Sequence, residues 1–168
     1  CITDPPYGMG MEHWDHSVPS VEIWEEVLRA LKPGAFCLSF CSPQLYHRMA
    51  TAVEDAGFNI KDQIMWMITT KMPKKNRLNI IGEVLEGHQK YFYAPRVTRK
   101  ERGDFNDHPT PKPIALMAYL SKIYCPPDKI VLDPFSGSGS TGLGAITEGR
   151  KFLGIEMEQK YVSISEQR

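Results

Sequence analysis

The 168-residue sequence lacks any long hydrophobic run, and this absence limits the class of protein. Its most apolar stretches, such as residues 64–68, fall far short of the roughly 20 apolar residues that cross a bilayer. A basic and then apolar N-terminus, which would mark a secretory signal, is also missing. With 42% hydrophobic and 24% charged residues, the composition excludes disordered and fibrous proteins. It predicts a single globular domain that does not enter a membrane.

Cysteine is scarce, and the four cysteines include no pair of the C-x-x-C type. This pattern argues against a disulfide framework and against a zinc site. Cys37 and Cys41 flank an apolar segment, so we expect small apolar side chains in or beside a buried strand. We therefore predict reduced thiols and no bound metal.

The formal net charge is zero, since 20 Lys and Arg balance 20 Asp and Glu, but the charges are unevenly distributed. Residues 1–30 contain six acids and one base, whereas residues 71–102 contain nine bases and three acids. The nine bases of this basic stretch are Lys71, Lys74, Lys75, Arg77, Lys90, Arg96, Arg99, Lys100 and Arg102. They interleave with Tyr91, Phe92 and Tyr93, a combination that suits phosphate neutralisation and base stacking. We predict a nucleic-acid contact here, with a solvated surface loop as the alternative.

Hydrophobic periodicity predicts short strands that alternate with helices. Expected helices cover residues 23–31, 45–56 and 113–124, a segment that ends near residue 148, and the C-terminal end. Expected strands cover residues 1–3, 35–40, 58–68, 130–133 and 152–156, and Ser42 and Pro43 are predicted to begin the second helix. This alternation predicts a mostly parallel sheet in a three-layer α/β fold. Residues 69–111 lose the period, apart from a short strand near residues 91–94, and form a predicted basic insertion.

The first motif with chemical meaning is a glycine-rich turn that follows an apolar strand, over residues 131–141. Gly137 and Gly139 allow a ligand to approach the backbone closely, and Glu156 follows Asp133 by 23 positions at the end of the next strand. A carboxylate there can accept hydrogen bonds from two ribose hydroxyls. Because only one G-x-G is present, a nucleoside without phosphates fits better than a dinucleotide. A tight turn with no ligand is the alternative.

The second motif is the tetrapeptide Asp4, Pro5, Pro6 and Tyr7, at the end of a strand, where open α/β sheets bind ligands. The two prolines fix the backbone and have no N–H, so they can only accept hydrogen bonds. The trio of a carboxylate, a carbonyl and an aromatic ring suits a planar aromatic amine. Asp4 and the Pro5 carbonyl would accept its two N–H bonds, while Tyr7 stacks on its ring. On its own the tetrapeptide could be an ordinary proline turn.

Together the two motifs resemble those of the S-adenosylmethionine-dependent DNA amino-methyltransferases, in the subgroup whose catalytic tetrapeptide precedes the cofactor motif. The resemblance extends over nearly the whole chain and implies a Rossmann-like methyltransferase fold, S-adenosylmethionine as cofactor and DNA as substrate. It implies catalytic roles for Asp4, Pro5, Pro6 and Tyr7, and aspartate at the first position favours adenine N6. Residues 91–103 resemble phage and bacterial adenine methylases, which implies restriction-modification and the cytoplasm of a bacterial cell or phage-infected host.

The resemblance also implies a cofactor site. His108, Thr110 and Lys112 match the segment that helps to close the methionine pocket in this subgroup. A plain loop turn at His108 and a surface position for Lys112 are the alternatives. The implied cofactor-binding residues are Asp133, Pro134, Phe135, Ser136, Gly137, Gly139, Thr141, Glu156, His108, Thr110 and Lys112.

The chain begins three residues before Asp4, whereas members of the subgroup usually carry a strand and a helix upstream. We therefore expect the sheet to lack one N-terminal strand. The alternatives to adenine methylation in DNA are cytosine N4 or RNA adenine methylation, and a non-catalytic nucleic-acid-binding subunit. Glutamine methylation is disfavoured, because asparagine would be expected in place of Asp4. A homodimer or a partner subunit is compatible with the resemblance.

Overall fold

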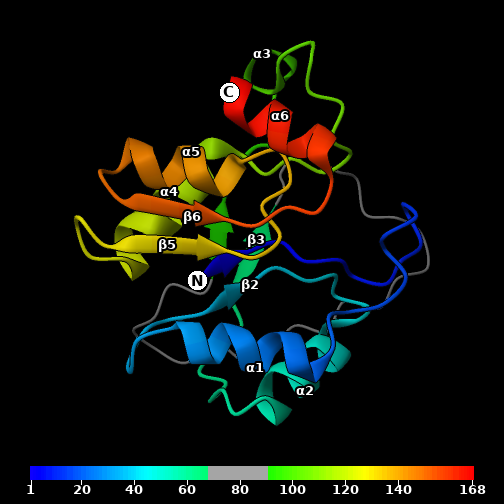
Figure 1. Ribbon diagram of the computed structural model, residues 1–168, viewed down its shortest axis with the longest axis vertical. Coiled ribbons are helices and arrows are strands. Elements are labelled where there is room, and N and C mark those ends of the chain that lie inside the picture. The colour runs from blue at the N-terminus through cyan, green and yellow to red at the C-terminus, as the bar shows by residue number, and fades with distance from the viewer. Residues whose placement is uncertain (68–90) are drawn as a thin grey trace.

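The computed structural model describes residues 1–67 and 91–168 (Figure 1). The described strands are β1 (Ile2–Thr3), β2 (Leu38–Ser39), β3 (Met65–Met67), β4 (Tyr91–Tyr93), β5 (Ile130–Asp133) and β6 (Lys151–Gly154). The described helices are α1 (Val21–Ala30), α2 (Tyr46–Asp55), α3 (Arg99–Arg102), α4 (Ile114–Tyr124), α5 (Ser140–Thr147) and α6 (Gln159–Gln167). Strands β1 and β2, β3 and β4, and β5 and β6 form parallel pairs. The predicted α/β fold with mostly parallel strands is confirmed.

Side chains near β1 and β2 alternate between two hydrophobic cores, one on each face of the strands. Ile2 belongs to the core shared with α4 and α5, and Leu38 and Phe40 pack against it. Cys37 and Cys41, at the alternate positions, pack instead against the core formed by α1 and α2. In Figure 1, α1 and α2 lie on one side of the strands, and α4 and α5 lie on the other. The three predicted layers are confirmed, as is the apolar packing of these cysteines.

The two motifs meet because β1 and β5 are neighbours. The Thr3 hydroxyl of β1 donates a 2.6 Å hydrogen bond to the Asp133 carboxylate at the end of β5. Since Asp4 follows β1 directly and Pro134 follows β5, both motifs begin at the same edge of the strands. Ligands of open α/β sheets bind at this edge.

Several predicted boundaries are wrong, among them that of the last strand, which was predicted over residues 152–156 and is Lys151–Gly154. The strand predicted over residues 58–68 is reduced to β3, because residues 60–63 are all exposed and lie outside any described strand pair. The strand predicted over residues 35–40 is reduced to Leu38–Ser39. Helix α2 begins at Tyr46, one turn later than predicted, because Ser42 only accepts a 3.4 Å bond from the Gln44 amide within a turn.

Of the predicted insertion over residues 69–111, residues 91–111 are described, and residues 68–90 of the chain lie outside the described residues. The short strand predicted near residues 91–94 is confirmed as β4, which pairs with β3. The Trp66 indole of β3 donates to the Ala94 carbonyl at 3.1 Å, which secures the end of β4. Helix α3 follows and was not predicted. Within the described residues, no helix is long and apolar enough to cross a membrane.

Candidate active site

The Asp4 carboxylate is held from both sides as the chain leaves β1. The Tyr7 hydroxyl donates to one of its oxygens, and the Lys112 ammonium donates to the other. The Asp4 and Lys112 side chains are only 17% and 10% exposed, so this is a largely buried ion pair. Burial raises the pKa of Tyr7, and the neighbouring Asp4 charge raises it further, so the hydroxyl stays protonated and can donate.

Lys112 lies in the catalytic half of the site. Its ammonium group is 5.4 Å from the centre of the Phe40 ring and 6.0 Å from that of Tyr7, so two aromatic faces and one carboxylate surround the charge. The alternative of a surface lysine is wrong, because Lys112 is 9% exposed. A cofactor contact, which the family resemblance implies, stays a prediction.

Asp133 is 1% exposed, and its carboxylate fixes the start of the glycine turn. It accepts hydrogen bonds from the Thr3 hydroxyl and, at 3.1 Å, from the Phe135 amide. Burial raises the pKa of Asp133 to about 6, against the opposing effect of hydrogen bonds from Thr141, Thr3 and Phe135. This side chain therefore joins β1, β5 and α5.

Both glycines of the turn are required by their surroundings. Gly137 has a φ of 52°, and a Cβ atom added there would lie 2.8 Å from the His108 ring. Gly139 has a φ of 79°, and its added Cβ would lie 2.8 Å from Ser165 of α6. Left-handed backbone is costly for other residues. The turn is therefore compact, with its backbone packed against His108 and α6.

Glu156 contacts the same turn from the end of β6. One carboxylate oxygen accepts the Gly137 amide at 2.7 Å, and the other accepts the Glu158 amide at 2.9 Å. The predicted acid thus reaches the glycine turn across 19 residues of sequence, as a ribose-binding carboxylate at this position must.

His108 forms the wall opposite the turn. Burial is the largest cause that lowers its pKa, to about 4, so the ring is neutral at pH 7. It packs edge-to-face on Tyr161 of α6, with ring centres 4.5 Å apart, and it stacks with Trp14 at 6.5 Å. Arg102 donates to the His108 carbonyl at 2.6 Å and to the Asn106 carbonyl at 2.7 Å. His108 is therefore packed on several sides, which disfavours the alternative of a plain loop turn.

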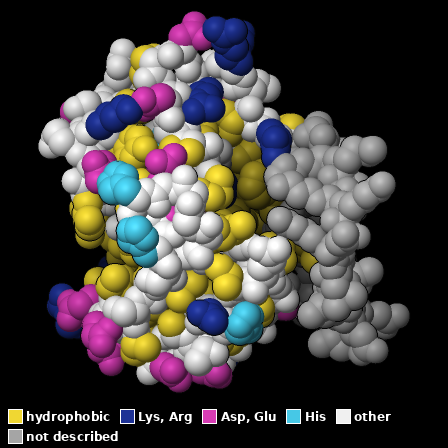
Figure 2. Space-filling view, turned by 90° about the vertical axis from the view of Figure 1, so that its right-hand side faces the viewer, with side chains coloured by type: hydrophobic (Ala, Val, Ile, Leu, Met, Phe, Trp, Pro, Cys, Tyr) yellow, Lys and Arg dark blue, Asp and Glu magenta, His cyan; other side chains and the backbone are white. Residues whose placement is uncertain are grey.

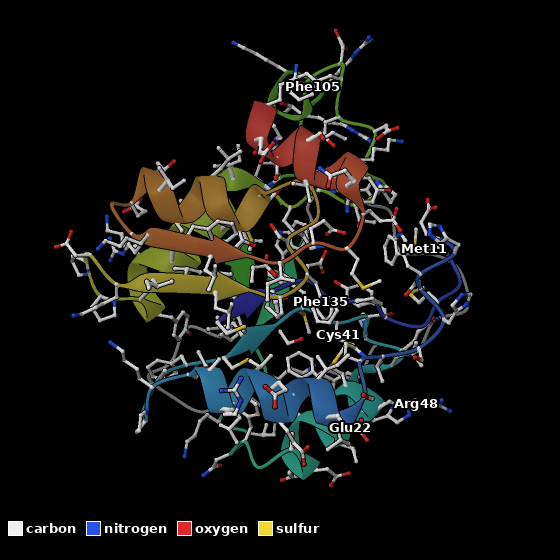
Figure 3. The ribbon with its side chains drawn as sticks, viewed as in Figure 1. Met11, Glu22, Cys41, Arg48, Phe105 and Phe135 are labelled. Atoms are coloured by element: carbon white, nitrogen blue, oxygen red, sulfur yellow. The ribbon has the colours of Figure 1, made fainter. Side chains whose placement is uncertain are left out.

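A cavity of about 1810 Å³ joins the two motifs. It is lined by the tetrapeptide, by His108, Thr110 and Lys112, and by the glycine turn with Glu156. Figure 3 shows Phe135 near the centre of the molecule and Met11 on an outlying loop, and both side chains line this cavity. With the sole exception of Gly139, every predicted catalytic and cofactor residue lines it, so the structure brings the two predicted sites together.

The predicted nucleic-acid-binding residues fall into three groups. Lys71, Lys74, Lys75, Arg77 and Lys90 lie outside the described residues. Arg96, Arg99 and Lys100 are exposed on and near α3, although Arg99 also contacts Asp104 at 3.1 Å. Arg102 is half-buried and engaged with the two carbonyls beside His108. Its prediction as a DNA contact is untested, but its hydrogen bonds favour a structural role.

Two residues of the site were missed from the sequence. Thr3 could have been found by noting that the ends of neighbouring parallel strands meet, which brings it next to Asp133. The Asp15 carboxylate accepts the amides of Tyr7, at the end of the tetrapeptide, and of Gly8 after it, and two glycines at positions 8 and 10 were the signal for that tight loop. Among the described residues, no group of three His, Cys, Asp or Glu could hold a metal ion.

Comparisons with known proteins agree with this geometry. The DNA adenine methyltransferase YhdJ of Escherichia coli (strain K12) is 45% identical over 74 residues, which cover 44% of this chain and 25% of YhdJ. The crystal structure of the M1.HpyAVI–SAM complex is similar with a TM-score of 0.71 and 28% identity, covering 99% of this chain and 86% of that chain. The cytosine-N4-specific PvuII DNA methyltransferase shares the fold, with a TM-score of 0.66 and 18% identity over 98% of this chain and 77% of its own.

The profile of the DNA methylase family, of the N6/N4 type, matches residues 1–91 and 86–167, which together are nearly the whole chain. The Rossmann-like α/β fold and the shared cavity of the two motifs are in accord with this match. The chain belongs to the DNA methylase family.

Proposed function

We propose that this DNA methylase transfers a methyl group from S-adenosylmethionine to the exocyclic N6 amine of adenine in DNA. The observation that supports this most directly is the shared cavity, which is lined both by Asp4 and Tyr7 and by the glycine turn with Glu156. A target amine and a methyl donor could therefore meet between them.

The residues present fit S-adenosylmethionine. A Cβ atom on Gly137 would meet the His108 ring, so the glycine turn and His108 pack closely together where they line the cavity. Glu156 is half-buried beside it, with lone pairs left for ribose hydroxyls after its two amide contacts. Ile155 and Met157 flank Glu156, line the cavity and are 54% and 90% exposed, so they could serve as apolar walls for an adenine ring. When bound, the cofactor supplies an electrophilic methyl group on its sulfonium.

Asp4 and Pro5 would orient the amine. The exocyclic nitrogen of adenine is a poor nucleophile, because its lone pair is delocalised into the ring. Hydrogen bonds from its two N–H groups to the Asp4 carboxylate and the Pro5 carbonyl favour a pyramidal nitrogen whose lone pair points away from the ring. Each Asp4 oxygen keeps a free lone pair beside its contact with Tyr7 or Lys112. The expected contribution is orientation and electrostatics, with no covalent enzyme intermediate.

The target base must leave the base stack of the DNA duplex before it can be methylated. A base inside a duplex cannot reach the cavity, so the nucleotide has to flip, and the Tyr7 ring would then stack on it. The basic stretch is the proposed phosphate contact, and Arg96, Arg99 and Lys100 are exposed near α3. Figure 2 shows acidic side chains gathered at the lower edge of one face. Among the acidic residues, α1 exposes Glu22, Glu25 and Glu26. That surface would repel phosphate, which favours approach from another side.

The choice of adenine is supported by Asp4 and by the similarity to YhdJ, which is named as an adenine methyltransferase. Cytosine N4 is the second candidate, because the PvuII enzyme has the same fold and is cytosine-N4-specific. Both bases present an exocyclic amine, so the tetrapeptide chemistry suits either.

The test is a direct analysis of the product. Unmethylated DNA is incubated with S-adenosylmethionine carrying a labelled methyl group, digested to nucleosides, and separated. We expect the label in N6-methyldeoxyadenosine. Label in N4-methyldeoxycytidine would replace the adenine proposal by the cytosine one. No transfer, from protein that binds S-adenosylhomocysteine, would favour a non-catalytic nucleic-acid-binding subunit.

A further inference from the structure

Every backbone N–H from Tyr7 to Met11 donates to a single residue, Asp15. One oxygen of its carboxylate accepts the Tyr7 and Gly8 amides, both at 2.7 Å. The other oxygen accepts the Met9 amide at 3.1 Å and the Met11 amide at 3.2 Å. The remaining amide, of residue 10, donates to the Asp15 backbone carbonyl at 2.9 Å. Backbone amides that converge in this way form an anion-binding nest, and here the chain supplies its own anion.

The loop can wrap around the carboxylate only because of its glycines. Gly8 and Gly10 have φ values of 72° and 65°, which other residues rarely adopt. A Cβ atom on Gly8 would lie 2.9 Å from the Ser17 backbone. Asp15 itself is 4% exposed, so its charge is neutralised mainly by these amides and not by water.

This arrangement fixes Tyr7 at two points. Its amide is bound by Asp15, and its hydroxyl is bound by Asp4, so the ring between them has little freedom. The same loop then reaches His108 and the start of α6. Trp14 stacks with His108, and the His13 ring lies 3.3 Å from the Glu158 carboxylate. Asp15 therefore organises a loop that begins at the tetrapeptide and ends beside α6.

We propose that Asp15 is a positioning residue for methyl transfer, which sets the place of the Tyr7 ring by holding the backbone of residues 7–11. The inference rests on the proposed function. Asp15 lies at the wall of the cavity, but both of its carboxylate oxygens are occupied by the amides of Tyr7, Gly8, Met9 and Met11, so we expect it to act on the loop and not on the base or the cofactor. Its effect on the reaction passes through Tyr7.

The first experiment compares D15N and D15A with wild type. In D15N one carbonyl oxygen can still accept two amides, but the new NH₂ group faces N–H donors and cannot accept them. We expect D15N to lower kcat by about 10-fold and D15A by more, because small displacements of an orienting group are costly. The affinity for S-adenosylhomocysteine should stay within about 3-fold of wild type. E25Q, which removes a carboxylate from the exposed face of α1, is the control and should behave as wild type.

The second experiment is a double-mutant cycle with Y7A. If Asp15 acts through the Tyr7 ring, D15N should lower kcat much less in the Y7A background, by less than about 2-fold. A full loss in both backgrounds, a matching loss of cofactor affinity, or a wild-type rate for D15N would each contradict the inference while leaving the proposed function intact. An inactive wild-type protein would contradict the proposed function itself, and the inference with it.

Discussion

Two carboxylates at the same edge of the strands have opposite surroundings. Asp4 is paired with Lys112 and receives the Tyr7 hydroxyl, whereas the hydrogen bonds to Asp133 come from neutral groups, namely two threonine hydroxyls and an amide. An ionised carboxylate that is buried without a cation is disfavoured, which explains why the pKa of Asp133 is raised. The charge of Asp133, unlike that of Asp4, therefore has no cation beside it.

Asp133 should make a pH-dependent contribution to stability. Its pKa is about 6 in the folded protein against 3.8 ordinarily, so the folded state binds the proton more readily. The resulting stabilisation is present below pH 3.8 and is lost as the pH rises through 6. We expect D133N to gain stability relative to wild type between pH 4 and pH 7, by about 3 kcal/mol, measured by urea unfolding.

D107N is the matched control for this measurement. Its hydrogen bond from Lys160 lowers the pKa of Asp107, so the folded state binds the proton less readily. As the pH rises through the acid range, the stability of D107N relative to wild type should therefore fall, whereas that of D133N should rise. A stability difference between D133N and wild type that does not vary with pH would contradict the burial account.

The substitution K112M distinguishes two roles of Lys112, the pairing with Asp4 and the binding of the cofactor. In K112M the largely buried Asp4 carboxylate loses its cation, so we expect the free energy of unfolding to fall by roughly 2 kcal/mol and kcat to fall more than cofactor affinity. The control is K160M, since Lys160 and Asp107 form an exposed ion pair whose loss should barely change Tm. If K112M instead weakens S-adenosylhomocysteine binding and leaves kcat unchanged, Lys112 is a cofactor residue, as the family resemblance implies.

Among the helices, the short helix α3 caps the N-terminus of the longer helix α4. Pro113 precedes α4 and provides no side-chain cap, but the Ile114 amide at the helix start donates to the Glu101 carboxylate of α3 at 2.6 Å. Thr98 in turn accepts the Glu101 amide at 3.1 Å and begins α3. A carboxylate at a helix N-terminus is favourable for both hydrogen bonding and the helix dipole.

Removing that cap should destabilise the protein. We expect E101A to lower the free energy of unfolding by about 1 kcal/mol, whereas E101Q, which keeps an acceptor oxygen, loses less. Thermal unfolding followed by circular dichroism measures the difference. K100A, an exposed change on the same helix, should leave Tm unchanged. Equal Tm values for E101A and K100A would show that the cap adds nothing.

Elements with a strong local signal could be predicted from the sequence. Strand β5 has the predicted bounds, and the glycine turn after it begins α5 as expected. The strand over residues 58–68 was overestimated, because alternation alone says nothing about whether a neighbouring strand is there to pair with it. Helix α3 was not predicted, although Thr98 and Glu101 are spaced as a capping pair. The helix has only four residues, so this signal is easy to overlook.

At the scale of the whole molecule, the sequence predicted which residues line the cavity better than it predicted what they contact. The tetrapeptide and the glycine turn were recognised by spacing within each motif. The pairing of Lys112 with Asp4 spans 108 residues, so no local pattern could indicate it. The same holds for Thr3 and Asp133, which are 130 residues apart and depend on the order of the strands.

We propose that Asp4 addresses the amine of the target base while the glycine turn and Glu156 hold the cofactor. The most direct measurement compares methyl transfer and S-adenosylhomocysteine affinity in Asp4→Ala and wild-type protein, with circular dichroism to confirm that both are folded. We expect methyl transfer to fall by a factor on the order of 10² or more, as for the removal of one preorganised polar contact, while cofactor affinity stays within about 3-fold of wild type. A folded Asp4→Ala protein that transfers methyl groups at a near wild-type rate would contradict it.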